Sequence, residues 1–137
     1  DAQLSRGLGD VYKRQGYQCA VLSILARRVY TIERIKNLHE GSNNIFEKLK
    51  LTNIVSKYDD GNNGWIEQIP FDRIIFTAAS KKINNEIFSH IENEGIIVSP
   101  IVKNNKQILV KYTKQKNKII SKEYDDVLFV PNLQGVV

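Results

Sequence analysis

The chain has 137 residues, of which 42% are apolar and 26% charged, and its net charge is +5; these values describe one ordinary soluble domain with a sizeable core. No apolar run approaches the roughly 20 residues that span a membrane, and no secretory signal is recognisable, so we expect no membrane partner. The single cysteine, Cys19, excludes an internal disulfide, and we therefore expect a cytoplasmic protein.

Residues 1–15 differ from the rest of the sequence. They show no sustained period of either helix or strand. The sequence contains no methionine, and DVYKRQ resembles translated sequencing-adapter sequence. We therefore expect residues 1–15 to be a non-native or unstructured leader, and the domain to comprise residues 16–137.

Helix and strand patterns alternate in the next part of the chain. Residues 17–28 carry one apolar stripe at helical spacing, formed by Ala20, Val21, Ile24 and Leu25. Residues 29–32 favour a strand ending at Glu33, because they are mostly β-branched or aromatic. A second helix is predicted over 35–49, where Gly41 costs roughly 1 kcal/mol and permits a break.

Two further strands follow. Residues 53–58 are β-prone and lead into a loop of turn formers, 59–64. Residues 72–77 predict a buried strand, and its continuous apolar run is typical of a parallel strand covered on both faces. It ends in a hydroxyl and two small side chains, Thr77, Ala78 and Ala79. Small residues there leave room for a ligand in an open α/β sheet, although an ordinary turn is the alternative.

A third helix and a buried strand are predicted next. Apolar residues within 83–91 recur at helical spacing, and Gly95 is the expected stop signal. Residues 96–98 predict a buried strand closed by Pro100.

The end of the chain has a β pattern. Residues 107–113 and 118–122 predict an antiparallel hairpin, and 127–130 predict a last strand ending at Pro131. The whole order predicts an α/β fold with parallel strands and an antiparallel edge.

Acidic residues stand at two strand ends, where ligands bind in such folds. Glu33 follows the strand 29–32, and a carboxylate there can accept both hydroxyls of a ribose. Asp60 follows the strand 53–58 and can accept a hydrogen bond from the exocyclic amine of a purine. The alternatives are a surface carboxylate that caps the next helix for Glu33, and an Asx-turn residue for Asp60.

Several segments together resemble one family. In chain order they are GYQCAVL, RRVYTIERI, NIVSKYDDGNNGW, PFDRIIFTAA, EGIIVSPI and VLFVPNLQG. They resemble protein-L-isoaspartate O-methyltransferase from Gly16 to about Gly135, and VYTIER with PFDRII-x-TAA is far more specific than any single glycine pattern. The resemblance implies a Rossmann-like methyltransferase sheet, mostly parallel with antiparallel C-terminal edge strands, whose first strand is missing here.

The resemblance also implies roles for nine residues. S-adenosyl-L-methionine would be bound by Gly16, Tyr17, Gln18, Glu33, Asp60 and Gly61, with Glu33 on the ribose and the last two beside the adenine. Thr77, Ala78 and Ala79 would help to form the pocket for an isoaspartyl residue. No catalytic residue is expected within this chain, because the serine implicated in the family lies upstream.

The implied reaction methylates the free carboxylate of L-isoaspartyl residues in damaged proteins, and the ester then cyclises to a succinimide. A carboxylate is ionised near pH 7, so no strong general base or metal is needed. Positioning and desolvation would supply most of the catalysis. The expected partners are isoaspartyl proteins or peptides, and we expect a monomer for the full-length protein.

Two departures from the family pattern matter. Asp59-Asp60-Gly61 stands where the family shows Gly-Asp-Gly. The acidic-Gly-x-Gly-x-Gly turn is absent before Gly16, and Gly7 and Gly9 do not replace it because no buried strand precedes them. We therefore expect a truncated and impaired copy, a poor enzyme with an association-prone sheet edge.

Two other functions remain open. One is an S-adenosylmethionine-dependent methyltransferase acting on a small molecule, against which 77–79 argues. The other is a non-catalytic basic binding module, suggested by the lysine-rich hairpin, with salt-sensitive affinity for nucleic acid. No nucleic-acid motif accompanies these lysines, so we expect no specific nucleic-acid partner.

Other reactive residues predict little chemistry. His39 and His90 lack the spacing of zinc ligands, and both are expected at the surface. Asp125-Asp126 has no partner ligands, and the apolar neighbours of Cys19 favour a small packed side chain.

Overall fold

The computed structural model describes residues 16–137, which form two compact units. Unit 1 holds the described chain up to Gly61 together with Gln134–Val137, and unit 2 comprises Asn62–Leu133. The expected leader, 1–15, lies outside the described residues. None of the helices in the described part is long and apolar enough to cross a membrane.

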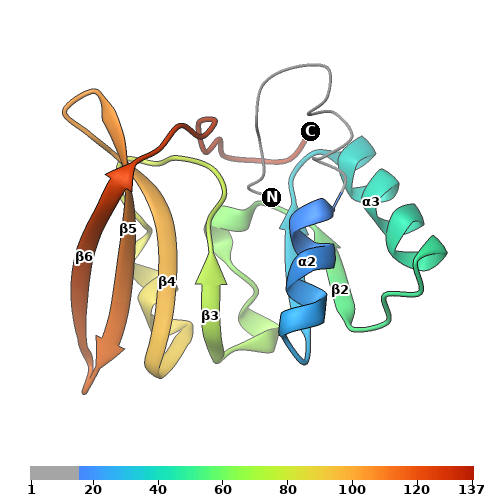
Figure 1. Cartoon of the computed structure of the whole chain (residues 1–137), viewed down its shortest axis with the longest axis horizontal. Coiled ribbons are helices and arrows are strands. Elements are labelled where there is room, and N and C mark those ends of the chain that lie inside the picture. The colour runs from blue at the N-terminus through green and yellow to red at the C-terminus, as the bar shows by residue number, and fades with distance from the viewer. Residues whose placement is uncertain (1–15) are drawn as a thin grey trace. The chain divides into compact units, whose positions relative to one another are not determined.

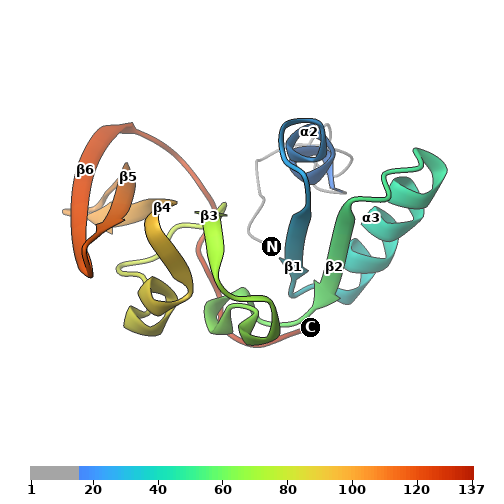
Figure 2. The same cartoon turned by 90° about the horizontal axis from the view of Figure 1, so that it is seen from below.

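Unit 1 is a pair of parallel strands with two helices packed against it. In chain order its elements are α2 (Tyr17–Leu25), β1 (Val29–Glu33), α3 (Lys36–Lys48) and β2 (Ile54–Tyr58). Figure 1 shows α2 beside β1, and Figure 2 shows α3 along β2. Both predicted strands are confirmed. The break considered possible at Gly41 does not occur, because α3 runs through it with Ser42 and Phe46 buried on one side.

Helix α2 is more exposed to solvent than its apolar stripe predicted. None of its residues is buried, and Ile24 and Leu25 are 82% and 78% exposed. Its start is nevertheless fixed by Gly16, whose φ is +89°. A Cβ there would lie 2.5 Å from Cε1 of Phe46, so both the backbone and the packing require glycine.

Unit 2 is a four-stranded sheet in the order β3-β4-β5-β6. The first pair is parallel and the other two pairs are antiparallel, so the predicted antiparallel edge is confirmed. Figure 1 shows β4, β5 and β6 side by side. Its regular strands are β3 (Phe71–Ile75), β4 (Ile91–Lys103), β5 (Lys106–Gln115) and β6 (Lys118–Asp126), with short 3₁₀ turns η1 (Gly61–Asn63), η2 (Ile66–Gln68) and η3 (Asn85–Ser89).

The helix predicted over 83–91 is wrong. Only η3 forms there, beginning where the Asn84 side chain accepts the N–H of Glu86. It ends because β4 begins at Ile91, which pairs with Phe71, and because Lys114 Nζ donates to the Phe88 and Ile91 carbonyls at 3.2 and 2.9 Å. The isoleucine spacing identified core positions correctly but not their conformation.

The limits predicted for the following strand are also wrong. Gly95 lies inside β4 rather than ending a helix, and β4 continues through Pro100 to Lys103. Pro100 does not end the strand, because it stays in register with Leu109 of β5, and its carbonyl accepts the N–H of Ser80 at 3.2 Å.

The last predicted strand, 127–130, does not form. The Gln107 side chain takes the place of a neighbouring strand, since its Nε2 donates to the Phe129 carbonyl at 2.9 Å and its Oε1 accepts the Phe129 N–H at 2.5 Å. Pro131 makes an isolated bridge to Ala79.

The core of unit 2 covers one face of its sheet. Four buried isoleucines form it, namely Ile83, Ile87, Ile91 and Ile97. The rings of Phe88 and Tyr112 meet edge to face beside them, with centroids 5.4 Å apart. Ile75 is 43% exposed, so the prediction that β3 is covered on both faces is wrong for the described residues. Within those residues, β1 and β3 each pair along one edge only.

Candidate functional site

The carboxyl end of β1 carries a buried carboxylate. Glu33 is 6% exposed, and its Oε1 accepts the N–H of Ile35 at 2.7 Å. Ile35 occupies the N-cap position of α3. Glu33 therefore does cap the next helix, as the alternative interpretation expected. Its carboxylate is enclosed at the strand end, however, and does not lie at the surface.

Asp60 lies at the neighbouring strand end. The two parallel strands place Glu33 opposite Tyr58, and the Asp59 N–H donates to the Glu33 carbonyl at 3.2 Å. The Asp60 Oδ2 accepts the N–H of Gly135 at 2.7 Å. Unit 1 thus brings the two predicted ligand carboxylates and Gly61 to the same end of its sheet.

The additional carboxylate, Asp59, has partners of its own. The Lys57 ammonium, 2.8 Å from its Oδ2, lowers the pKa of Asp59, and the Asp60 N–H, which donates to Oδ1 at 2.8 Å, lowers it further. Asp59 therefore bonds the next N–H along the chain, and this bond is not the Asx turn that was considered for Asp60, which would join residues two apart. The nearby lysine offsets the extra negative charge of this loop.

The other predicted cofactor residues begin α2. Gly16 is buried, Tyr17 is 64% exposed and Gln18 is half-buried. Only residues 26–28 connect α2 to β1, so the helix runs back along the strand (Figure 1) and begins toward its carboxyl end. The helix start therefore lies at the same end of unit 1 as Glu33.

The predicted substrate residues follow β3 in unit 2. Thr77, Ala78 and Ala79 are 9%, 4% and 5% exposed. The backbone of Ala79 is held by the C-terminal segment, since its N–H donates to the Val130 carbonyl and its carbonyl accepts the Asn132 N–H, at 2.7 and 2.8 Å. The hydroxyl of Thr77 is buried without a hydrogen-bond partner among the described residues. That substrate binds here stays a prediction.

The two histidines and the cysteine each lie against neighbouring residues rather than at an open surface. His90 is only 6% exposed, so its predicted surface position is wrong; it packs against Gly64, where a Cβ would lie 2.6 Å from its Nδ1. His39 is half-buried beside the Tyr58 ring. Burial raises the pKa of the Cys19 thiol, although a hydrogen bond to Thr31 opposes this shift. No cluster of three metal-ligating side chains occurs within 16–137.

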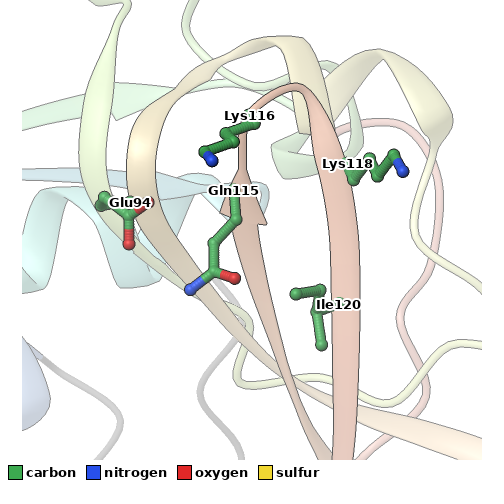
Figure 3. Close-up of a pocket in the computed structure, with 5 residues that line it drawn as sticks. All are labelled: Glu94, Gln115, Lys116, Lys118 and Ile120. Atoms are coloured by element: carbon green, nitrogen blue, oxygen red, sulfur yellow. The ribbon is translucent and has the colours of Figure 1, made fainter.

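The lysine-rich hairpin carries acidic partners. Lys103 contacts Glu123 at 2.6 Å, and Lys106 contacts Asp126 at 3.6 Å. An open hollow of about 470 Å³ lies near the β5–β6 turn and involves none of the predicted site residues (Figure 3). It is lined by Glu94, Gln115, Lys116, Lys118 and Ile120.

Sequence reasoning missed the contact made by Gln134–Val137, here called the C-terminal strap. The strap belongs to unit 1 and hydrogen-bonds to Arg34, Asp60 and Tyr58. All of these bonds use backbone groups of the strap, so no side-chain pattern within the strap could have predicted them. The one available signal was Arg34, which directly follows Glu33 in VYTIER.

Comparison with known proteins assigns the chain to a family. The family model for protein-L-isoaspartate(D-aspartate) O-methyltransferase matches residues 7–136. The chain belongs to this family. The resemblance drawn from the residues is thereby confirmed, while the boundary expected at residue 16 stays a prediction.

Individual isoaspartate methyltransferases agree with this assignment. The protein-L-isoaspartate O-methyltransferase of Maricaulis maris is 44% identical over 120 residues, which are 88% of this chain and 56% of that protein. The one from Helicobacter pylori strain J99 is 40% identical over 137 residues, 99% of this chain and 63% of that protein. The chain thus spans less than two thirds of the length of these relatives.

Solved structures with low sequence identity confirm the Rossmann-like α/β fold. One protein-L-isoaspartate O-methyltransferase has a TM-score of 0.82 at 20% identity, over 89% of this chain and 40% of that one. A Plasmodium falciparum chain described as a beta-aspartate methyltransferase, in complex with S-adenosyl-L-homocysteine, has a TM-score of 0.69 at 23% identity. That match covers 86% of this chain and 58% of the Plasmodium chain.

Proposed function

We propose that this chain contributes to S-adenosyl-L-methionine-dependent methylation of L-isoaspartyl carboxylates in damaged proteins. The observation that carries the proposal is the enclosed carboxylate of Glu33 at the end of β1, beside the end of β2 that leads to Asp60, in a chain of this family. We also propose a cytoplasmic setting and, for the full-length protein, a monomer.

The residues of unit 1 fit the nucleoside half of the methyl donor. An ionised carboxylate is an acceptor with two oxygens, and Glu33 keeps this capacity after accepting one N–H at Oε1. It would bind the ribose hydroxyls, while Asp60 and Gly61 would border the adenine. Gly16, Tyr17 and Gln18 would contact the donor from the helix start. When bound, the donor supplies an electrophilic methyl group on a sulfonium sulfur.

Unit 2 would receive the isoaspartyl residue at Thr77, Ala78 and Ala79. Burying an unpaired hydroxyl costs about 1–3 kcal/mol, and a polar substrate group would relieve that cost at Thr77. The small side chains of the two alanines would leave space for the carboxylate. A carboxylate oxygen would attack the methyl carbon, forming the ester O–C bond as the C–S bond breaks, without any base.

A pair of peptides that differ only in the aspartyl linkage tests this proposal. The chain is incubated with methyl-labelled S-adenosylmethionine, and base-labile methyl ester is counted. We expect ester on the isoaspartyl peptide and none on the normal peptide. Equal labelling of both peptides, or labelling of small metabolites instead, would contradict the assigned substrate.

A further inference from the structure

The C-terminal strap closes a ring of hydrogen bonds around the end of unit 1. The Gly135 N–H donates to Asp60 Oδ2 at 2.7 Å, and the Gly135 carbonyl accepts from Arg34 Nε at 2.8 Å. The Val137 N–H then donates to the Arg34 carbonyl at 2.8 Å, and the Val137 carbonyl accepts the Lys36 N–H at 2.7 Å. The Tyr58 hydroxyl donates to that same carbonyl at 3.2 Å.

These anchor points lie next to the proposed donor ligands. Arg34 follows Glu33 directly, and Lys36 begins α3 two residues later. Tyr58 is the last residue of β2, and Asp60 is itself a proposed ligand. The strap therefore ties together the two loops that leave β1 and β2, and it orients the Asp60 carboxylate through one N–H.

Hydrogen bonds rather than apolar burial hold the strap. Val136 and Val137 are 46% and 65% exposed, so their side chains add little to any core. Arg34 donates to the strap through its side chain and accepts from it through its backbone. The strap is not held by apolar packing. The side-chain hydrogen bond of Arg34 can therefore be removed without opening a cavity.

We propose that Arg34 is a positioning residue which, by holding Gly135, fixes the Glu33 and Asp60 loops in the geometry that binds the nucleoside half of the methyl donor. This inference rests on the proposed function. It assigns to Arg34 and the strap an effect on ligand affinity rather than on the stability of the fold. Neither Arg34 nor the strap touches the reacting methyl group in this account.

Adenosine is the suitable probe, because it carries only the two groups that Glu33 and Asp60 would bind. The full chain is titrated with adenosine, following the backbone amide signals of Ile35 and Asp60 by NMR. The variants are Arg34→Ala, Arg34→Lys, which keeps a side-chain donor, and deletion of residues 134–137. Arg28→Ala is the matched control, because Arg28 is an exposed arginine at the opposite end of β1.

We expect R34A to weaken adenosine binding about fivefold, as loss of one hydrogen bond would. The strap deletion should weaken it further, R34K should restore it to within about twofold, and R28A should leave it unchanged. The melting temperatures of R34A and R28A should agree. Exchange of the Lys36 amide should speed up in the deletion variant, because its acceptor is Val137.

The opposite results distinguish failure of the positioning role of Arg34 from failure of the nucleoside site. Unchanged adenosine affinity in both R34A and the strap deletion would overturn the positioning role while leaving the proposed nucleoside site intact. Weaker binding that R34K does not restore, together with a lowered melting temperature, would make Arg34 merely structural. No adenosine binding by the parental chain would overturn the nucleoside site itself, and the positioning role with it.

Discussion

Unit 2 contains a cluster of four buried isoleucines, whereas the buried apolar side chains of the described part of unit 1 are Val29 and Phe46. Ile91 and Ile97 of unit 2 are 1% and 0% exposed. In unit 1, by contrast, Ile24 and Leu25 of α2 remain mostly exposed. The enclosed carboxylate and the strap nevertheless lie in unit 1. The comparison indicates that stability is concentrated in unit 2 and proposed donor binding in unit 1.

Truncating one isoleucine in each unit should give the largest contrast. Ile97→Ala removes a fully buried side chain and should lower the free energy of unfolding by about 2–5 kcal/mol. Ile24→Ala removes an 82% exposed side chain and should change it by less than about 0.5 kcal/mol. Urea unfolding followed by the fluorescence of Trp65, the single tryptophan, reports unit 2, and circular dichroism near 222 nm reports the helices of unit 1. Equal losses would show that α2 is buried in solution.

Glycine replacements should affect the two units separately. Gly16→Ala would place Cβ 2.5 Å from the Phe46 ring, and Gly64→Ala would place it 2.6 Å from Nδ1 of His90, both at positive φ. Each should cost about 1–3 kcal/mol, the first mainly in the circular-dichroism transition and the second in the fluorescence transition. Gly61→Ala is the control, since no atom lies within 4 Å of its added Cβ. A neutral G16A would contradict the close packing of Gly16 against Phe46.

The smallest predicted effect is a pH dependence at Asp59. The pKa of this carboxyl in the folded chain lies below its ordinary value of 3.8, mainly because of Lys57. It therefore contributes stability above pH 3.8, and this contribution is lost as the pH falls through the folded-state pKa. Asp59→Asn keeps the acceptor for the Asp60 N–H and should cost about 0.2–1 kcal/mol at pH 6 but little near pH 2. A cost that does not change with pH would exclude the Lys57 ion pair as its cause.

The strands near 29–33 and 54–58 and the β5–β6 hairpin were predictable because their signals are local. Val29–Glu33 is mostly β-branched or aromatic and ends in an acid, and Lys116-Asn117 separates two β-prone runs with both residues at positive φ. The VYTIER and PFDRII-x-TAA segments were specific enough to identify the family by their residues and spacing.

Features that depend on distant contacts could not be predicted. The isoleucines of 83–91 have helical spacing, yet pairing of Ile91 with Phe71 and the Lys114 contacts replace the helix with a 3₁₀ turn. The strand expected over 127–130 does not form, because the side-chain amide of Gln107 hydrogen-bonds to the backbone N–H and carbonyl of Phe129. His90 is buried because it packs under Gly64. None of these partners is near in the sequence.

Binding of S-adenosyl-L-homocysteine, measured by calorimetry on the parental chain and on Glu33→Gln, tests the central claim most directly. The glutamine keeps an oxygen acceptor for the Ile35 N–H, so the start of α3 should be preserved. We predict saturable binding by the parental chain and about tenfold weaker binding by E33Q, the effect of losing a charge-assisted hydrogen bond of about 1.5 kcal/mol. Equal binding by both chains, or none by the parental chain, would contradict a donor site built on Glu33.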